Sequence, residues 1–464
     1  MTGVSERTPE IVVVALLLLL LAAGFGLGGG GGQGAARARP AQPASGPASP
    51  ARASATPPAA DPARRVALIA VRVQAIRGLR FRLRLLPRRV SAAQARQEGL
   101  ADFDRSSAPA RLHAQEELLE LLGLVPPGTN LRRLQAAVFG EQVAGFYDPR
   151  LKRLSIVQGV GGSGAGVGAL DDITLAHELN HGLEDQRFGI HDTSTGADDS
   201  SSAYTALVEG TATEVMTRYA LRYVSSGQSL SGALGVLAQQ QHTMKLPPYF
   251  EASLLFPYEA GQRFVESLYG FAHGWRLVNL ALRYQPPLST EQVLHPEKWL
   301  RIENPVPVRL AVGARLGRGW HRLTAGELGE WDTGQLLLRA GASPLVARAA
   351  AAGWGGARYE LWRHGSGGAV AGCSAPCRRR DALVVSWAWD TPHDAREFDA
   401  ALPALLARGL HARGGGGSSW HLSGGAAAVS RRSQSTTLAF APTRRLAAVL
   451  ASRAVAPAGR GQAR

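Results

Sequence analysis

The chain has 464 residues, of which 45% are hydrophobic and 19% charged, so a wholly disordered protein is excluded. Its formal net charge is +15, but the cations are almost all arginine, and no arginine–lysine stripe interleaved with aromatic residues is present. The composition therefore argues against a nucleic-acid partner. The length predicts two folded units together with terminal segments.

The N-terminus carries an uninterrupted apolar run, Ile11–Ala23. This length is typical of a signal peptide and short for a membrane-spanning helix. We expect residues 1–27 to be a signal peptide or a retained N-terminal membrane anchor, two alternatives that the sequence leaves open. Residues 28–63 are rich in Gly, Ala and Pro and are expected to form a disordered linker. The prediction is an extracytoplasmic protein, secreted or anchored to a bacterial membrane by its N-terminus.

Residues 64–310 are expected to form the first folded unit. Near its start, Leu79, Phe81, Leu83 and Leu85 alternate with arginines, as in a β-strand. Three helices follow: one over Ala92–Phe103 with Ser91 as its cap, one over Leu112–Leu122 that ends at Gly123, and one over Leu131–Phe139.

A β-hairpin is predicted over residues 142–157, with Asp148-Pro149-Arg150 as its turn. The Gly-rich stretch Gly159–Gly168 comes next. It lacks the Lys-Ser/Thr ending of a phosphate-binding loop, so we interpret it as a connecting loop and not as a nucleotide site.

The segment that follows contains His177-Glu178-Leu179-Asn180-His181. Asp171 and Asp172 before it suit a helix N-terminus, and histidines four residues apart lie on one helix face. Two imidazoles placed in this way can bind one tetrahedral zinc ion. Glu178 stands beside the first histidine, where it can act as general base on a zinc-bound water whose pKa the metal lowers to about 7. The pattern predicts a zinc metallopeptidase.

The third protein ligand decides the subclass. Metzincins carry Gly three and His six residues after the second histidine, but Glu184 and Arg187 stand there, so that class is excluded. Glu209 is the favoured ligand. It is expected near the start of a second amphipathic helix, and a His-His-Glu site leaves the fourth position to water. Three competitors stay open, namely Glu214, His191 and Asp192.

These motifs carry a resemblance to a known family. The runs Ala176–Phe188, Val208–Thr213 and Glu141–Arg150 resemble an uncharacterised bacterial family of gluzincin-type zinc metallopeptidases, distantly similar to thermolysin-like enzymes. The resemblance extends over residues 64–410. It implies a mainly helical, zincin-like catalytic domain with a small sheet. It also implies an edge strand before the zinc helix, a place that Leu151–Val157 takes, to pair with an extended peptide substrate.

One departure from the family concerns the residues that orient the ligands. Gluzincins typically carry Asp four residues after the ligand Glu, where this chain has Thr213. Thr213 can accept a bond from a ligand histidine only as a weaker partner. Asp185, one helical turn after His181, is either a replacement partner for a ligand histidine or a solvated surface carboxylate.

Peptide hydrolysis also needs a hydrogen-bond donor for the negative oxygen of its tetrahedral intermediate. His295, in the sequence His295-Pro296, is the first choice, and Tyr258 in Phe256-Pro257-Tyr258 is the second. For both residues a structural role is the alternative.

The remaining chain predicts a small α+β module over residues 311–454. Strands are expected over Leu383–Trp389, 426–429 and 436–440, and a helix over Ala395–Leu406. Residues 455–464 are expected to be a disordered tail. Cys373 and Cys377 fit a small disulfide loop and two free thiols equally well.

The sequence as a whole therefore predicts an α+β protein with one catalytic zinc ion and a peptide or protein substrate. The alternative is a non-catalytic zincin-fold protein that binds zinc or a protein partner. The presence of Glu178 favours the enzyme, and the oligomeric state is left open.

Overall fold

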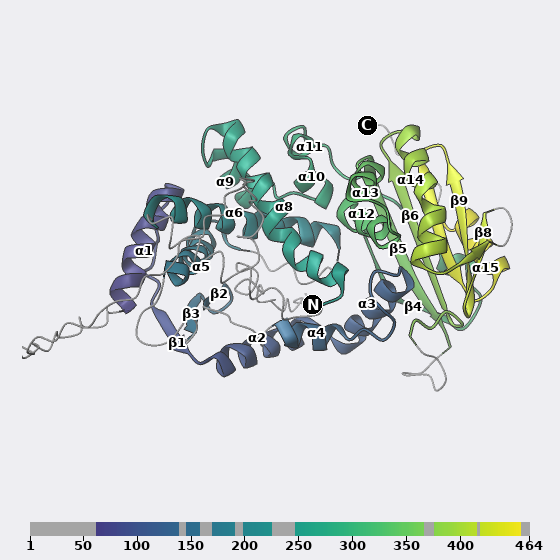
Figure 1. Cartoon of the computed structure of the whole chain (residues 1–464), viewed down its shortest axis with the longest axis horizontal. Coiled ribbons are helices and arrows are strands. Elements are labelled where there is room, and N and C mark those ends of the chain that lie inside the picture. Colours follow the sequence, from purple (N-terminus) through teal and green to yellow (C-terminus); the bar gives the residue numbers. More distant parts are fainter. Residues whose placement is uncertain are drawn as a thin grey trace, which may run out of the picture.

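The computed structural model describes residues 62–138, 145–157, 169–190, 198–224, 246–365, 375–414 and 418–455. The predicted signal peptide or anchor and the Gly-rich loop lie outside these residues. Of the predicted linker only residues 62 and 63 are described, and of the predicted C-terminal tail only Val455. His191, Asp192 and Cys373 also lie outside the described residues. Among the described helices, none combines the length and the apolar character needed to cross a membrane. The fold is mixed α+β, with helices gathered at one end and a large sheet at the other (Figure 1).

The N-terminal half is mainly helical. Ser91 caps its second helix as predicted, in a capping box with Gln94, and Gly123 takes a positive φ of 71° where the third helix ends. Its helices are α1 (Pro62–Arg77), α2 (Ala92–Ser106), α3 (Pro109–Leu121), α4 (Leu131–Val138), α5 (Ala169–Phe188), α6 (Asp199–Tyr223), α8 (Pro248–Ala272), α9 (Arg276–Arg283), α10 (Thr290–Leu294) and α11 (Pro296–Leu300).

A three-stranded sheet lies between α2 and α5 (Figure 1) and consists of β1 (Pro87–Val90), β2 (Gly145–Asp148) and β3 (Arg153–Val157). Its order is β1-β3-β2, with β1 parallel and β2 antiparallel to β3. The predicted hairpin is confirmed. The prediction that Leu151–Val157 is an edge strand is wrong, because β1 occupies the second edge of β3. Within the described residues, the other edge of this sheet is β2.

The alternating segment 79–85 is not a strand, since the strand begins only at Pro87. Leu79, Phe81 and Leu85 nevertheless point inward and pack against the core that contains α1 and α5. The fourth member of the pattern, Leu83, is exposed, so the period-2 alternation marks buried positions only in part, and within the described residues no neighbouring strand pairs with this segment.

Helices α6 and α8 cross at unusually short range. A Cβ added to Gly210 on α6 would lie 2.1 Å from the backbone carbon of Gly261 on α8, and one added to Gly261 would lie 2.0 Å from the carbonyl oxygen of Ala206. Two glycines at one crossing therefore let the helix backbones touch. α6 begins at Asp199, so Glu209 lies in its interior and not near its start as predicted.

The C-terminal half is built on a seven-stranded antiparallel sheet of order β4-β5-β6-β10-β9-β8-β7. The strand and helix predictions for this half are confirmed within a few residues. Its elements are β4 (Trp320–Gly326), α12 (Glu330–Arg339), α13 (Pro344–Ala351), β5 (Trp354–His364), β6 (Asp381–Trp389), α14 (Pro392–Ala404), the π-helical turn η4 (Leu405–Gly409), β7 (Arg413–Gly414), β8 (Ser419–Leu422), β9 (Gly425–Arg432), β10 (Ser435–Ala441) and α15 (Arg444–Arg453).

Alternation along β6 divides the helices between the two faces of this sheet. Leu383, Val385 and Trp387 pack with α12, α13 and α14, whereas Ala382 and Val384 pack with α15. The core on the first face also contains the end of α3 and the loop after it, from Leu118 to Val125. Figure 1 shows α3 beside the C-terminal sheet. The two halves therefore share a hydrophobic core, to which residues 311–454 and the N-terminal half both contribute.

A buried ion-pair cluster reinforces this contact. The guanidinium of Arg363 on β5 contacts Glu117 on α3 at 3.0 Å and binds Asp381 on β6 through two bonds of 2.6 Å. The backbone N–H of Cys377 also donates to Glu117. Cys377 is disulfide-bonded, and the other cysteine of the chain, Cys373, lies outside the described residues.

Candidate metal centre

Helices α5 and α6 bring three metal-binding side chains together. His177 and His181 lie one turn apart on α5, with their Nε2 atoms 2.9 Å apart. Oε2 of Glu209 on α6 lies 3.3 Å from Nε2 of His177 and 3.5 Å from Nε2 of His181. All three side chains are buried. The three residues that the sequence nominated as metal ligands therefore converge on one point.

The spacing of these atoms fits a tetrahedral metal ion. Zinc bonds of about 2.0–2.1 Å set neighbouring ligand atoms about 3.3–3.4 Å apart in a tetrahedron. The three separations, 2.9, 3.3 and 3.5 Å, bracket that value. Two imidazole nitrogens and one carboxylate oxygen are also the donor set that catalytic zinc prefers.

The hydrogen bonding of the cluster supports the same reading. Within the described residues, no hydrogen bond of ordinary geometry reaches either carboxylate oxygen of Glu209 or Nδ1 of His177, although these atoms are buried. The phenol of Tyr258 lies close to the Glu209 carboxylate. Buried polar atoms are nearly always satisfied in folded proteins. A carboxylate with unsatisfied oxygens between two imidazoles therefore indicates a place for a cation.

Glu178 lies next to the cluster and is held by the small sheet. Its Oε2 accepts a 2.8 Å hydrogen bond from the backbone N–H of Tyr147 on β2, whereas its Oε1 is buried without a partner. One oxygen is thus fixed and the other is left to accept a proton. The sequence analysis missed this role of Tyr147, because a backbone donor leaves no signal in the residue type.

The electrostatics of the cluster follow from its burial. Burial raises the pKa of Glu178 to about 8, a rise that Glu209 increases and His181 opposes. Burial also opposes ionisation of Glu209, but the two imidazoles outweigh it and lower the pKa of Glu209 to about 2. Glu209 is therefore the permanently charged member of the cluster, as a ligand carboxylate must be.

Three residues that the sequence placed around the metal have other partners or none. Asp185 is buried and bound by the hydroxyl of Tyr147 at 2.7 Å and by Nζ of Lys152 at 2.6 Å, so neither of its two predicted roles is correct. Glu214 is held by Arg218 at 2.6 Å and by Gln262 at 3.1 Å, which removes it as a ligand competitor. The hydroxyl of Thr213 is buried without a hydrogen bond and orients neither histidine.

Tyr258, the second choice for the oxyanion donor, is the one that reaches the site. Its ring stacks beside that of His177, with centroids 6.2 Å apart. Burial, followed by the nearby carboxylates of Glu209 and Glu178, raises the pKa of Tyr258 well above its ordinary value. Its phenol therefore keeps its proton and can donate it. Gly261 follows Tyr258 by one helical turn and lies where α8 meets α6, but that meeting is a tertiary contact that the sequence alone does not specify.

His295, the first choice, is not brought to the cluster. Its Nε2 lies 2.9 Å from Glu330 on α12, and the start of its helix is tied to Asp199 by the 2.9 Å bond from the Thr290 backbone. Asp199 and Glu209 are ten residues apart on α6, which corresponds to about 15 Å along a helix. The prediction for His295 is therefore contradicted, and the histidine joins the two halves of the chain instead.

An ion pair that the sequence analysis did not predict links α5 to α1. Arg77 on α1 and Glu184 on α5 are both fully buried and 3.0 Å apart. Arg77 also donates to Asn279 and stacks over the ring of Trp275, with its guanidinium 4.1 Å from the centroid. Arg77 follows Ile69 and Val73 along the buried stripe of α1, so its helical position could have revealed its burial.

The other acidic or histidine clusters of the described residues do not resemble this centre. Glu291, Glu303 and Asp390 surround the ammonium of Lys298 at 2.5–2.9 Å, so a cation already fills that group. A further group of His393, Asp394 and Glu397 includes two exposed residues.

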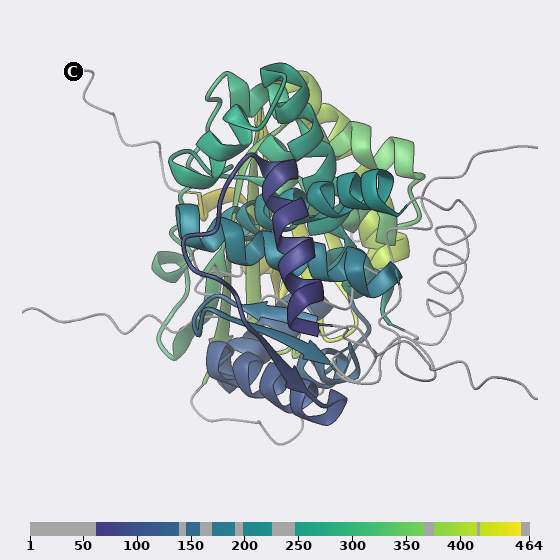
Figure 2. The ribbon, with the colours of Figure 1, turned by 90° about the vertical axis from the view of Figure 1, so that its left-hand side faces the viewer.

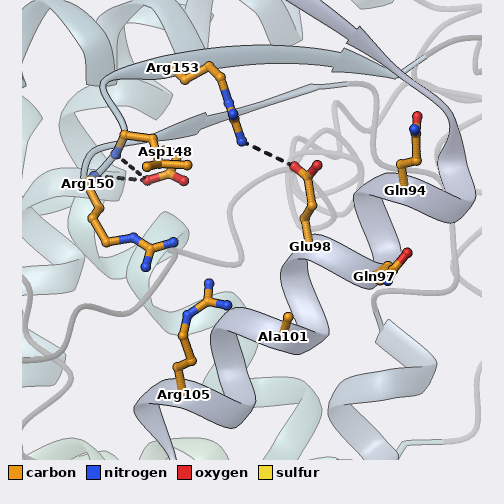
Figure 3. A pocket seen from close by; sticks show the side chains of 9 residues that line it. Gln94, Gln97, Glu98, Ala101, Arg105, Asp148, Arg150 and Arg153 are labelled. Atoms are coloured by element: carbon orange, nitrogen blue, oxygen red, sulfur yellow. Dashed lines mark hydrogen bonds and ion pairs between the residues drawn. The ribbon is translucent and has the colours of Figure 1, made fainter.

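A cavity of about 410 Å³ lies away from the cluster, between α2 and the turn that joins β2 and β3. Figure 3 shows Arg153 facing Glu98 across it, with Arg105 and Arg150 on the same side as Asp148. Because arginines and carboxylates alternate around this cavity, it has no dominant charge with which to select an ion.

Comparison with known proteins bears on the C-terminal half alone. A family model described as a domain of unknown function, DUF8575, matches residues 316–450. These residues comprise the large sheet and most of its helices. No curated protein and no protein of known structure matches the chain.

Proposed function

We propose that this protein is an extracytoplasmic zinc-dependent peptidase whose metal is held by His177, His181 and Glu209. One observation carries the proposal: two imidazole nitrogens and one carboxylate oxygen from two helices lie 2.9–3.5 Å apart and are buried, and within the described residues the carboxylate has no hydrogen bond of ordinary geometry. Zinc in such a site acts as a Lewis acid and lowers the pKa of water to about 7.

Three residues around the metal then have separate roles in peptide hydrolysis. Glu178 accepts a proton from the attacking water on its unpartnered Oε1, while the Tyr147 N–H fixes its other oxygen. The phenol of Tyr258 donates a hydrogen bond to the developing oxyanion beside His177. The Tyr147 N–H points away from β3 but is already bound to Glu178, so an extended substrate that pairs with the outer edge of β2 would have to use the other outward backbone groups of that strand.

The proposed location rests on two features. The apolar run Ile11–Ala23 has the length of an export signal. The disulfide of Cys377 is typical of proteins that fold in oxidising compartments.

The test combines metal analysis with peptide cleavage. The purified protein should contain about one zinc per chain, given the one His-His-Glu centre among the described residues, and should cleave a peptide library. Glu178→Gln should keep the zinc and lose cleavage, and Tyr258→Phe should keep the zinc and cleave about 10²–10³-fold more slowly.

Each alternative has its own outcome. Equal cleavage by the wild type and Glu178→Gln would overturn the mechanism. Zinc binding without cleavage of any library member would favour a non-catalytic zincin-fold protein that binds zinc or a partner. Absence of bound zinc after dialysis against the metal would overturn the centre itself.

A further inference from the structure

The segment between α1 and β1, Arg80–Leu86, presents arginines and leucines to solvent together. Arg80, Arg82 and Arg84 are exposed, and so are Leu83 and Leu86, at 73% and 67%. We call these residues the arginine segment.

The neighbouring helix continues this surface. Leu68 and Val71 on α1 are 51% and 60% exposed, and they lie three residues apart on one helix face. Figure 2 shows α1 and the segment that follows it running side by side on the face turned toward the viewer. The helix that carries the exposed Leu68 and Val71 therefore lies beside the arginine segment.

The arginine segment is fixed to the zinc helix and is not a free loop. Gln186 on α5 accepts hydrogen bonds from the backbone N–H groups of Arg82, at 2.8 Å, and Leu83, at 3.0 Å, and donates to the carbonyl of Leu83. Arg187 binds the carbonyl of Arg80 at 2.6 Å. Leu85 packs so closely on Gly182 that a Cβ there would lie 2.3 Å from its methyl carbon.

The charges of this segment are not neutralised by the residues that the structure describes. Within the described residues, none of the guanidinium groups of Arg80, Arg82 and Arg84 forms an ion pair, whereas the neighbouring Arg88 binds Glu98 at 2.7 Å. The segment therefore holds three uncompensated positive charges around an exposed leucine in a fixed backbone.

We propose that this surface docks on an anionic lipid bilayer. Arginines attract anionic headgroups, and the leucines and the exposed apolar residues of α1 can enter the interfacial region, where apolar side chains are favoured. A nucleic acid would match the charge, but it offers nothing to the leucines, and the segment has no exposed aromatic residue for base stacking. Docking holds α5, and with it the proposed metal centre, beside the headgroups.

The experiment places a fluorescent reporter at the centre of the surface. The described residues contain no free cysteine, so Leu83→Cys supplies a thiol for an environment-sensitive nitrobenzoxadiazole label in the full-length chain. Leu345→Cys on α13 is the matched control, because Leu345 is also a leucine exposed at 73%. Both labelled chains are titrated with phosphatidylcholine vesicles, with vesicles that also contain phosphatidylglycerol, and with double-stranded DNA.

The label at residue 83 should brighten and shift to the blue with the anionic vesicles only, while the label at residue 345 should not respond. Replacing Arg80, Arg82 and Arg84 by Ala in the labelled chain should move the titration to about hundredfold higher lipid, about fivefold for each arginine. The same loss of charge at three exposed arginines of the C-terminal half, Arg318, Arg322 and Arg408, should leave the titration unchanged.

Three outcomes would overturn the proposal: no response at residue 83, an equal response at residue 345, or a response to DNA in place of lipid. Because the label reports its immediate surroundings, lipid contact by the N-terminal residues cannot imitate the signal. Zinc content and cleavage do not enter the readout, so this proposal and the proposed peptidase activity fail independently.

Discussion

Gly210 allows α6 to approach α8 more closely than a residue with a side chain would permit, and it follows the proposed ligand Glu209 directly. In Gly210→Ala the new Cβ would lie 2.1 Å from the backbone carbon of Gly261 and 2.3 Å from its oxygen. Carbon atoms in contact prefer about 3.5–4.0 Å, so the helices must separate by about 1.5 Å at this point. Backbone on both sides leaves no side chain that can move aside.

The magnitude follows from two opposing effects. Overpacking of a tight core costs about 1–3 kcal/mol, and contact between two backbones belongs at the upper end. Alanine regains up to about 1 kcal/mol over glycine inside a helix. We therefore expect Gly210→Ala to lower the free energy of unfolding by about 2 kcal/mol. A shift of Glu209 far beyond the ±0.2 Å tolerance of metal bonds should also weaken zinc binding at least tenfold.

The matched control is Gly270→Ala on α8. A Cβ at Gly270 meets no atom within 4 Å, so only the gain in helix propensity remains, and the variant should be as stable as the wild type or slightly more stable. Urea unfolding followed by circular dichroism gives the stability, and competition with a chromophoric chelator gives the zinc affinity. If Gly210→Ala matched Gly270→Ala in both measurements, the close crossing and its role in placing Glu209 would be refuted.

Three further predictions concern the metal, the buried ion pair and pH. Glu209→Ala should weaken zinc binding by more than about a hundredfold, because loss of a ligand costs more than loss of a residue that only orients a ligand. Glu214→Ala should keep the metal. Elemental analysis after dialysis distinguishes the two variants. Arg77→Met leaves Glu184 buried without its cation and should lower the free energy of unfolding by about 3–5 kcal/mol. Adding Glu184→Leu should restore most of that loss in urea melts, and no recovery would contradict the pairing. Burial raises the pKa of Glu120 to about 7, so the folded state binds its proton more tightly than the unfolded state does. The free energy of unfolding should therefore fall as pH rises from about 4.5 to 7, by at most about 3 kcal/mol for this group. In Glu120→Gln that part of the fall should be absent, and identical pH profiles of the two proteins would contradict the assignment.

The helices and their ends were predictable because their signals are local. Ser91 with Gln94, and Gly123 after a helix, act within four residues of the chain, where capping chemistry decides the backbone. The pairing of His177 with His181 is local in the same sense, since 3.6 residues per turn put both on one face of any helix.

Pairings between distant segments were not predictable. β3 looked like an edge strand because its hairpin partner is adjacent in sequence, whereas β1, which covers its other edge, lies more than sixty residues earlier. The choice between His295 and Tyr258 depended on where α8 and α10 lie along α6, and no local pattern specifies that. Asp185 likewise looked like a partner for a ligand histidine until the fold placed Tyr147 and Lys152 against it.

The sequence by itself thus determined the helix that carries His177, Glu178 and His181, and it nominated Glu209. Only the tertiary structure decided that Glu209 meets the two imidazoles, because this requires α5 and α6 to pack and Gly210 to admit α8. Only the tertiary structure, too, supplied the Tyr147 N–H that holds Glu178. The physical reason is the range of the interactions: helix periodicity and capping act over a few residues, whereas a buried centre is assembled by packing between segments that the sequence keeps apart.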